Sequence, residues 1–166
     1  MQRTDERYAA YVRVLENHLK PAMGCTEPIA IAYAAALCAG TLGDPPEAVE
    51  ARVSGNILKN AKAVTVPNTG ARKGIDTACA AGIVSGHPER ELEVLTGLDD
   101  DGRRAIDALL QRGIIRVSLR PQARLFDIEI EMWGGGRRAL CRIADRHTNV
   151  VRLERDAEAN RRRCRR

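Results

Sequence analysis

The chain has 166 residues, 44% hydrophobic and only 3% aromatic, so it can bury one core of small aliphatic side chains but is too short for two full domains. Its formal net charge is +5, yet residues 155–166 alone hold six arginines against two acidic residues, so the remainder is nearly neutral and nucleic acid is not the partner we expect. No run approaches the roughly 20 apolar residues that span a bilayer, and the polar start lacks a signal-peptide apolar region, so we expect a cytoplasmic protein with no membrane partner.

Two helices are predicted in the first quarter of the chain. Residues 5–20 have apolar side chains at helical spacing, with Thr4 as the expected N-cap and Pro21 as terminator. Residues 28–41 are almost wholly apolar and rich in alanine, which predicts a buried central helix. Pro28 suits a first helical turn, and Thr26 or Glu27 can supply the N-cap oxygen.

Cys25 therefore lies in a short loop at the start of a helix. Free backbone N–H groups and the positive end of the helix dipole favour an anion there, either a thiolate at Cys25 or the carboxylate of a substrate. The other four cysteines do not form a CxxC pair with it. Cys38, Cys79 and Cys141 lie in apolar runs, where buried structural thiols are expected.

The middle of the chain alternates between short strands, loops and helices. Residues 49–53 and 64–66 are predicted to be extended, whereas 54–56 and 67–70 are rich in turn formers and are predicted to be loops. Helices are expected over 75–85 and 99–112, the second of them ending at Gly113.

The last third changes to alternating patterns, which predict strands. Strands are expected over 115–120, 127–132, 137–143 and 149–154, with the glycines at 134–136 forming a hairpin turn. Acidic residues at 127, 129 and 131 would lie beside arginines of neighbouring strands, either as cross-strand pairs on a solvated face or as a functional charge patch. The predicted fold class is α+β, with alanine-rich helices packed on a mainly antiparallel sheet over residues 8–154. Residues 155–166 are expected to form a disordered arginine-rich tail.

Four separated segments together resemble a known family. They are KPAMGCTEP at 20–28, SGNILKN at 54–60, VTVPNTG at 64–70 and HTNVV at 147–151. In order and spacing, residues 8–154 are similar to the amino-terminal portion of the iron–sulfur L-cysteine desulfidases, which are related to the alpha chain of L-serine dehydratases.

The resemblance implies a lyase that carries out β-elimination. Its substrate would be L-cysteine, giving pyruvate, ammonia and sulfide, or L-serine. A 4Fe-4S cluster held by three cysteines would bind the leaving group at an open iron, with Cys25 as one ligand. Family members are more than twice as long, so the other ligands would come from a complementary carboxy-terminal subunit. A homo-oligomer is also expected.

The resemblance and the residue types together suggest candidate site residues, each with a structural alternative. Thr26 either binds a substrate carboxylate or caps the helix, and His147 is either the catalytic acid or base or a strand-end hydrogen-bonding residue. Substrate-pocket residues or turn formers are expected at Asn56, Asn60, Asn68 and Thr69.

Two other functions fit the same sequence. The chain is either an inactive remnant or regulatory subunit of such a lyase, or, less readily, a module that binds RNA or another polyanion through the arginines of residues 155–166.

Overall fold

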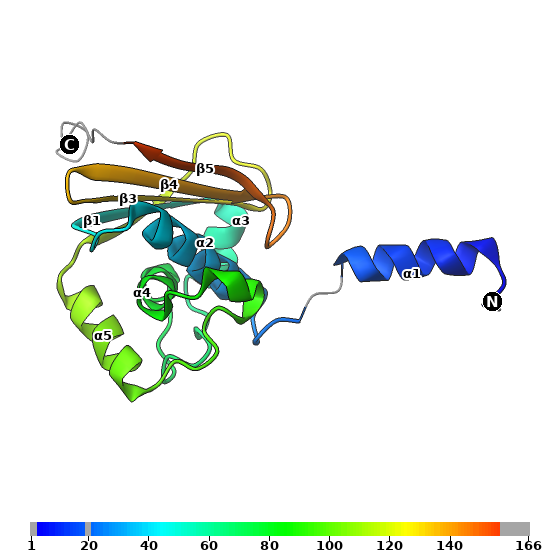
Figure 1. The fold of residues 1–166 in the computed structure, drawn as a ribbon, viewed down its shortest axis with the longest axis horizontal. Coiled ribbons are helices and arrows are strands. Elements are labelled where there is room, and N and C mark those ends of the chain that lie inside the picture. The colour runs from blue at the N-terminus through cyan, green and yellow to red at the C-terminus, as the bar shows by residue number, and fades with distance from the viewer. Residues whose placement is uncertain (1–2, 19–20, 157–166) are drawn as a thin grey trace.

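The computed structural model describes residues 3–18 and 21–156 (Figure 1). Within these ranges the helices are α1 (Glu6–His18), α2 (Thr26–Leu42), α3 (Gly55–Ala61), α4 (Ile75–Ser85) and α5 (Asp100–Gln111), with a 3-10 helix η1 (Pro88–Glu93). The strands are β1 (Ala48–Val53), β2 (Ile115–Leu119), β3 (Asp127–Gly134), β4 (Arg137–Ala144) and β5 (Val150–Asp156). The tail was predicted over residues 155–166, but residues 155 and 156 belong to β5, where they pair with β4; the rest of the predicted tail, with Cys164, lies outside the described residues.

The strands form one sheet in the order β2-β1-β3-β4-β5. Only β1 and β2 are parallel; the other neighbours are antiparallel, so the α+β class with a mainly antiparallel sheet is confirmed. Helices α2 and α4 lie on one face of this sheet (Figure 1). None of the helices in the described part of the chain is long and apolar enough to cross a membrane.

Helix α2 is the centre of the core. Its residues from Pro28 to Ala36 are all buried, because this part of α2 packs between the sheet and the other helices. Gly82 of α4 allows the closest helix contact: a Cβ atom there would lie 2.0 Å from the carbonyl oxygen of Ala32. Glycine is therefore required at this crossing, whereas Gly40 of α2 has no atom within 4 Å of such a Cβ position.

Several predicted boundaries were wrong. Residues 54–56 are not a loop, because Ser54 accepts a hydrogen bond from the Ile57 N–H and so begins helix α3. Residues 64–66 do not form a strand, since Thr65 makes only an isolated bridge with Lys73. Asp5 rather than Thr4 accepts the first-turn hydrogen bond of α1.

The N-cap prediction for α2 was also wrong. Cys25 is the N-cap residue, without a side-chain capping bond, so Thr26 is already helical. Pro28 consequently falls on the third helical residue, where a missing N–H still costs no intrahelical bond.

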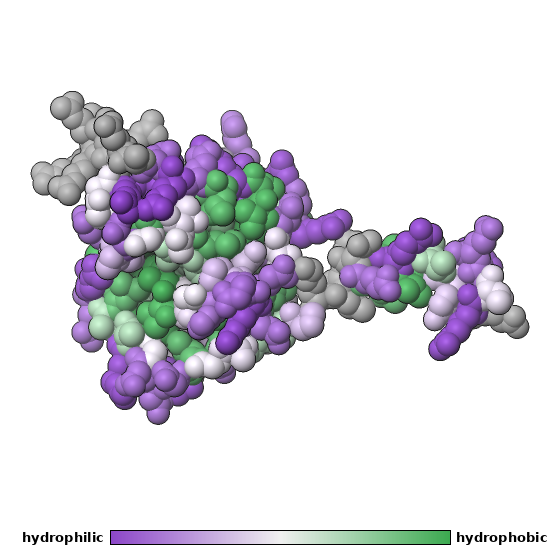
Figure 2. All heavy atoms as spheres, in the orientation of Figure 1, coloured by the Kyte–Doolittle hydropathy of each residue, from purple (hydrophilic) through white to green (hydrophobic). Residues whose placement is uncertain are grey.

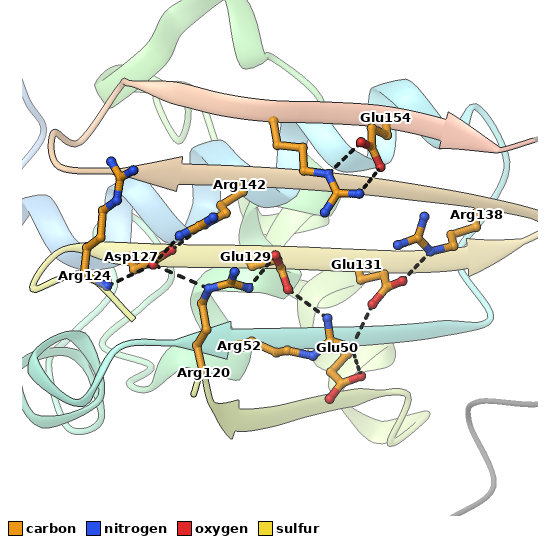
Figure 3. A network of polar contacts seen from close by, with 11 residues as sticks. Glu50, Arg52, Arg120, Arg124, Asp127, Glu129, Glu131, Arg138, Arg142 and Glu154 are labelled. Carbon is orange, nitrogen blue, oxygen red and sulfur yellow. Dashed lines mark hydrogen bonds and ion pairs between the residues drawn. The ribbon is translucent and has the colours of Figure 1, made fainter. Parts of the chain in front are cut away.

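The face of the sheet opposite the helices carries charges (Figure 3). Asp127, Glu129 and Glu131 alternate with the buried Ile128 and Ile130 along β3. These carboxylates were expected on a solvated face, yet Asp127 is 0% exposed and Glu129 only 5%. The reason is that long arginine side chains lie over them, contributed by Arg52, Arg120, Arg138 and Arg142. The expected cross-strand pairing is present.

Candidate functional site

The amino-terminal end of α2 holds a compact group of polar side chains. The Cys25 thiol donates a hydrogen bond to Oε2 of Glu27 at 3.4 Å, and the Thr26 hydroxyl donates to the same oxygen at 3.3 Å. Cys25 is exposed, whereas Thr26 and Glu27 are half-buried. The carboxylate of Glu27 therefore occupies the place at the helix end where a substrate carboxylate was expected.

The loop before α2 brings a second segment to this group. Gly24 has φ +82, and a Cβ atom on it would lie 3.2 Å from Cγ of Pro67. Glycine meets both requirements, because it tolerates positive φ and leaves room for the proline ring. The Pro67–Gly70 loop is thereby held beside Cys25.

His147 approaches the same group from the turn between β4 and β5. Its ring lies 4.5 Å from that of Phe126, centroid to centroid, with an interplanar angle of 57°. The negative charge of Glu27 raises the pKa of His147, and the charge of His147 lowers the pKa of Glu27. His147 and Glu27, 120 residues apart in sequence, thus share one electrostatic environment.

The fourth segment joins through Ser54, just before α3. Its hydroxyl donates to the carbonyl oxygen of Leu125 at 2.8 Å, and its N–H donates to that of Asp127 at 2.9 Å. These bonds hold α3 next to the strand end that carries Phe126. The four segments singled out in the sequence therefore meet around the start of α2.

The protonation states of the group follow from its surroundings. Burial and the hydrogen bond to Glu27 raise the pKa of the Cys25 thiol, so the thiolate expected from the helix dipole is not the favoured form. Although burial alone would raise it, the pKa of Glu27 is lowered by hydrogen bonds from its own N–H, Cys25 and Thr26. Burial lowers the pKa of His147, although the charge of Glu27 opposes this. Near neutral pH the group comprises a thiol, a carboxylate and a neutral imidazole.

The other predicted residues differ in what their side chains do. Thr69 is fully buried and its hydroxyl donates to the carbonyl oxygen of Val66, while the Asn68 amide donates to that of Leu95. Both bonds fix the loop, which is the structural alternative considered for them. Asn56 and Asn60 are half-buried on α3, and their amides make no hydrogen bond to the described residues.

The described cysteines do not form the ligand set of an iron–sulfur cluster. Cys38, Cys79 and Cys141 are 0% exposed in the core, and burial raises the pKa of each thiol. Among the described residues, no group of three or more His, Cys, Asp or Glu side chains is placed to hold a metal ion. Cys25 as a cluster ligand stays a prediction that requires two ligands from elsewhere.

Sequence reasoning missed two members of the group. Glu27 was considered only as a helix cap. Its position two residues after Cys25, at the start of the same helix, could have indicated a contact between the thiol and the carboxylate. Phe126 carries no such signal, because its contact with His147 depends on how the strands pair.

The chain matches several curated bacterial proteins. It is 43% identical over 151 residues to the UPF0597 protein of Oleidesulfovibrio alaskensis, covering 91% of this chain and 35% of that protein. It is 43% identical over 158 residues to that of Desulfitobacterium hafniense, covering 95% and 37%, and 42% over 144 residues to that of Finegoldia magna, covering 86% and 34%. The chain is similar to UPF0597 proteins. It spans about a third of the length of these relatives, whose shared name states no activity.

No family model and no solved structure matches the chain. Together with the UPF0597 names, this overturns the assignment to the iron–sulfur L-cysteine desulfidase family. The four sequence segments nevertheless lie near one another in the fold, around the start of α2.

Proposed function

We propose that the group formed by Cys25, Glu27 and His147 performs acid–base catalysis of β-elimination on a small α-amino acid, L-cysteine or L-serine. The observation that carries the proposal is the meeting of Cys25, Glu27 and His147 at the start of α2, where the thiol is hydrogen-bonded to the carboxylate and the carboxylate interacts with the imidazole. The directions of their pKa shifts favour a protonated thiol, a carboxylate and a neutral imidazole. An elimination needs one group that removes the α-proton and one that protonates the leaving group.

The protonation states assign the roles. The neutral imidazole of His147 accepts the α-proton, and the carboxylate of Glu27 stabilises the imidazolium that forms. The Cys25 thiol gives its proton to the departing sulfide or hydroxide and regains one from His147. The Cα–H bond and the Cβ–S or Cβ–O bond break, a Cα=Cβ bond forms, and the aminoacrylate product hydrolyses to pyruvate and ammonia.

Substrate binding is assigned to α3. The amides of Asn56 and Asn60, four residues apart on α3, make no hydrogen bond to the described residues. The N-cap residue of this helix, Ser54, bonds to the carbonyl oxygen of Leu125, which precedes Phe126. The two amides can bind the substrate's carboxylate or amino group. Because the chain covers about a third of its relatives, we further propose that a complementary polypeptide completes the pocket.

The test is pyruvate formation from each amino acid. The chain is assayed alone and after co-expression with a polypeptide that corresponds to the unmatched part of the Oleidesulfovibrio alaskensis relative. We expect pyruvate from the combination, and a loss of about 10²-fold or more for His147→Gln. Glu93→Gln, an exposed carboxylate on η1, is the matched control and should retain activity. A combination that assembles but forms no pyruvate from either amino acid contradicts the proposal and favours an inactive or regulatory role.

A further inference from the structure

The loop from Pro67 to Arg72, which lies beside Cys25, has a backbone that needs support. Asn68 has φ 60 and Ala71 has φ 68, values in the left-handed region that residues other than glycine rarely adopt. Asparagine tolerates this conformation, whereas alanine adopts it at a steric cost. Such conformations persist only where surrounding contacts fix them, so the 67–72 loop must be held from outside.

Helix α5 holds the 67–72 loop from one side. The Arg72 guanidinium forms two bonds with the Asp107 carboxylate, Nε to Oδ1 at 2.6 Å and Nη2 to Oδ2 at 2.5 Å. Through Nη1 the same guanidinium donates to the carbonyl oxygen of Thr69. One turn earlier on α5, Arg103 donates from Nε to the carbonyl oxygen of Asn68 at 2.9 Å. Two consecutive carbonyl groups of the loop are thus fixed from the same face of α5, by Arg103 directly and by Asp107 through Arg72.

The segment between η1 and α5 holds the 67–72 loop from the other side. The Asn68 amide donates to the carbonyl oxygen of Leu95 at 3.1 Å. The end of η1 also contacts the residues before α2, since the Met23 N–H donates to the carbonyl oxygen of Leu92 at 3.3 Å. The residue before Cys25 itself lies against the 67–72 loop. The three segments therefore support one another around the thiol.

We infer that Asp107 and Arg103 are positioning residues for Cys25, a proposal that rests on the proposed function only where it treats the thiol as a proton donor. Both residues act through the 67–72 loop. Asp107 orients Arg72, and together with Arg103 this pair fixes the loop carbonyl groups. The fixed loop stands against Gly24 and limits the water that reaches the sulfur.

A purely structural role is the alternative, and the exposure of the ion pair separates the two roles. The Asp107 side chain is 45% exposed and that of Arg72 is 28% exposed, and Figure 2 shows hydrophilic residues gathered over the start of α5. Ion pairs this exposed contribute little to global stability. Helix α5 is anchored in the core by the buried Ile106 and Leu109. Loss of the Asp107 carboxylate should therefore free the loop without unfolding α5.

The pH profile of Cys25 alkylation tests the inference, in a Cys164→Ser background because the other three cysteines are buried. Asp107→Asn removes the charge and keeps the shape of the side chain. We expect the midpoint of the profile to move to lower pH, because a looser loop lets water reach the thiol. Alkylation by iodoacetamide at pH 7.5 should speed up by about threefold, which corresponds to a shift of about half a pKa unit. Asp107→Glu keeps the carboxylate and should stay close to the wild type.

Two further variants separate positioning from a direct effect of charge. Arg103→Leu removes a positive charge, which on its own would raise the pKa of the thiol. We nevertheless expect the midpoint to move to lower pH, in the same direction as in Asp107→Asn, because both variants free the loop. Asp101→Asn removes a negative charge from the same helix, but Asp101 pairs with Arg104 and not with the loop. Its profile should match that of the wild type.

A wild-type profile in Asp107→Asn overturns the inference, as do equal shifts at Asp107 and Asp101 or opposite shifts in Asp107→Asn and Arg103→Leu. Urea unfolding of each variant should give a midpoint close to that of the wild type, and a midpoint that falls in parallel with the alkylation shift assigns a structural role instead. The readout is thiol alkylation and not pyruvate, so failure of the proposed elimination and failure of this inference are distinguishable.

Discussion

The thiol of Cys25 and the carboxylate of Glu27 share a hydrogen bond of 3.4 Å at the first turn of α2. The helix end alone would favour a thiolate. Burial is the main cause that reverses this preference and raises the pKa of the thiol, and the Glu27 carboxylate adds to it, because a negative charge beside the sulfur disfavours a second one. Glu27 therefore helps to keep Cys25 a proton donor.

Replacing Glu27 should make Cys25 more reactive. In Glu27→Gln the negative charge is gone, so the pKa of the thiol falls towards its ordinary value and more thiolate is present at pH 7.5. We expect alkylation by iodoacetamide to speed up by about 3- to 10-fold. A Cys164→Ser background leaves Cys25 as the one exposed cysteine, since the other three are buried. Glu93→Gln is the control, and an equal acceleration there would refute the assignment.

Much of this arrangement was predictable from sequence, because it depends on local patterns. The helix at 75–85 was predicted with its observed bounds, and the glycines at 134–136 marked the hairpin between β3 and β4. The parallel pairing of β2 with β1 was not predictable, since it joins segments more than 60 residues apart. The burial of Asp127 depends on arginines from other strands, which a one-strand pattern cannot show.

The candidate site also has one part that the sequence could predict and one part that it could not. Cys25, Thr26 and His147 could be singled out by residue type and position. Their relation could not, because the contact of His147 with Phe126 and the charge interaction with Glu27 arise only when the sheet and α2 come together. The family assignment failed because short motifs were given more weight than the comparisons support.

The crossing of α2 and α4 should not tolerate a methyl group. Gly82→Ala places Cβ against the backbone of Ala32, which cannot move aside cheaply, so we expect a loss of at least about 2 kcal/mol in the free energy of unfolding. Gly40→Ala is the same chemical change in open space and should be neutral or stabilising by about 0.5–1 kcal/mol. Urea unfolding of both variants decides the matter; similar effects at the two positions would contradict the close crossing.

The buried carboxylate of Asp127 should make stability depend on pH. Burial opposes its ionisation, but hydrogen bonds from Arg142 and Arg124 lower its folded-state pKa below the ordinary value. Its stabilising contribution is therefore complete above the unfolded-state pKa of about 3.9 and is lost as pH falls through the lower folded-state pKa.

Asp127→Asn should accordingly weaken the acid dependence of unfolding between about pH 5 and pH 2. It also leaves Arg142 without its carboxylate, so we expect a loss of about 2 kcal/mol at pH 7. Asp101→Asn removes an exposed partner of Arg104 and should cost under about 0.5 kcal/mol. An unchanged acid profile in Asp127→Asn, measured by urea unfolding across this pH range, would rule out the assigned role.

His147 offers the most direct test of the shared environment at the start of α2. Burial lowers its pKa below the ordinary 6.5, while the Glu27 carboxylate raises it. Removing that carboxylate in Glu27→Gln should therefore lower the pKa of His147 further, by several tenths of a unit. Phe126→Ala should act in the opposite direction, because loss of the ring exposes the imidazole to water and returns its pKa towards 6.5. NMR titration of the His147 ring protons measures both shifts, and His87, which is exposed, serves as the internal control. Shifts of the same sign in the two variants would show that His147 does not lie between a carboxylate and an apolar ring as described.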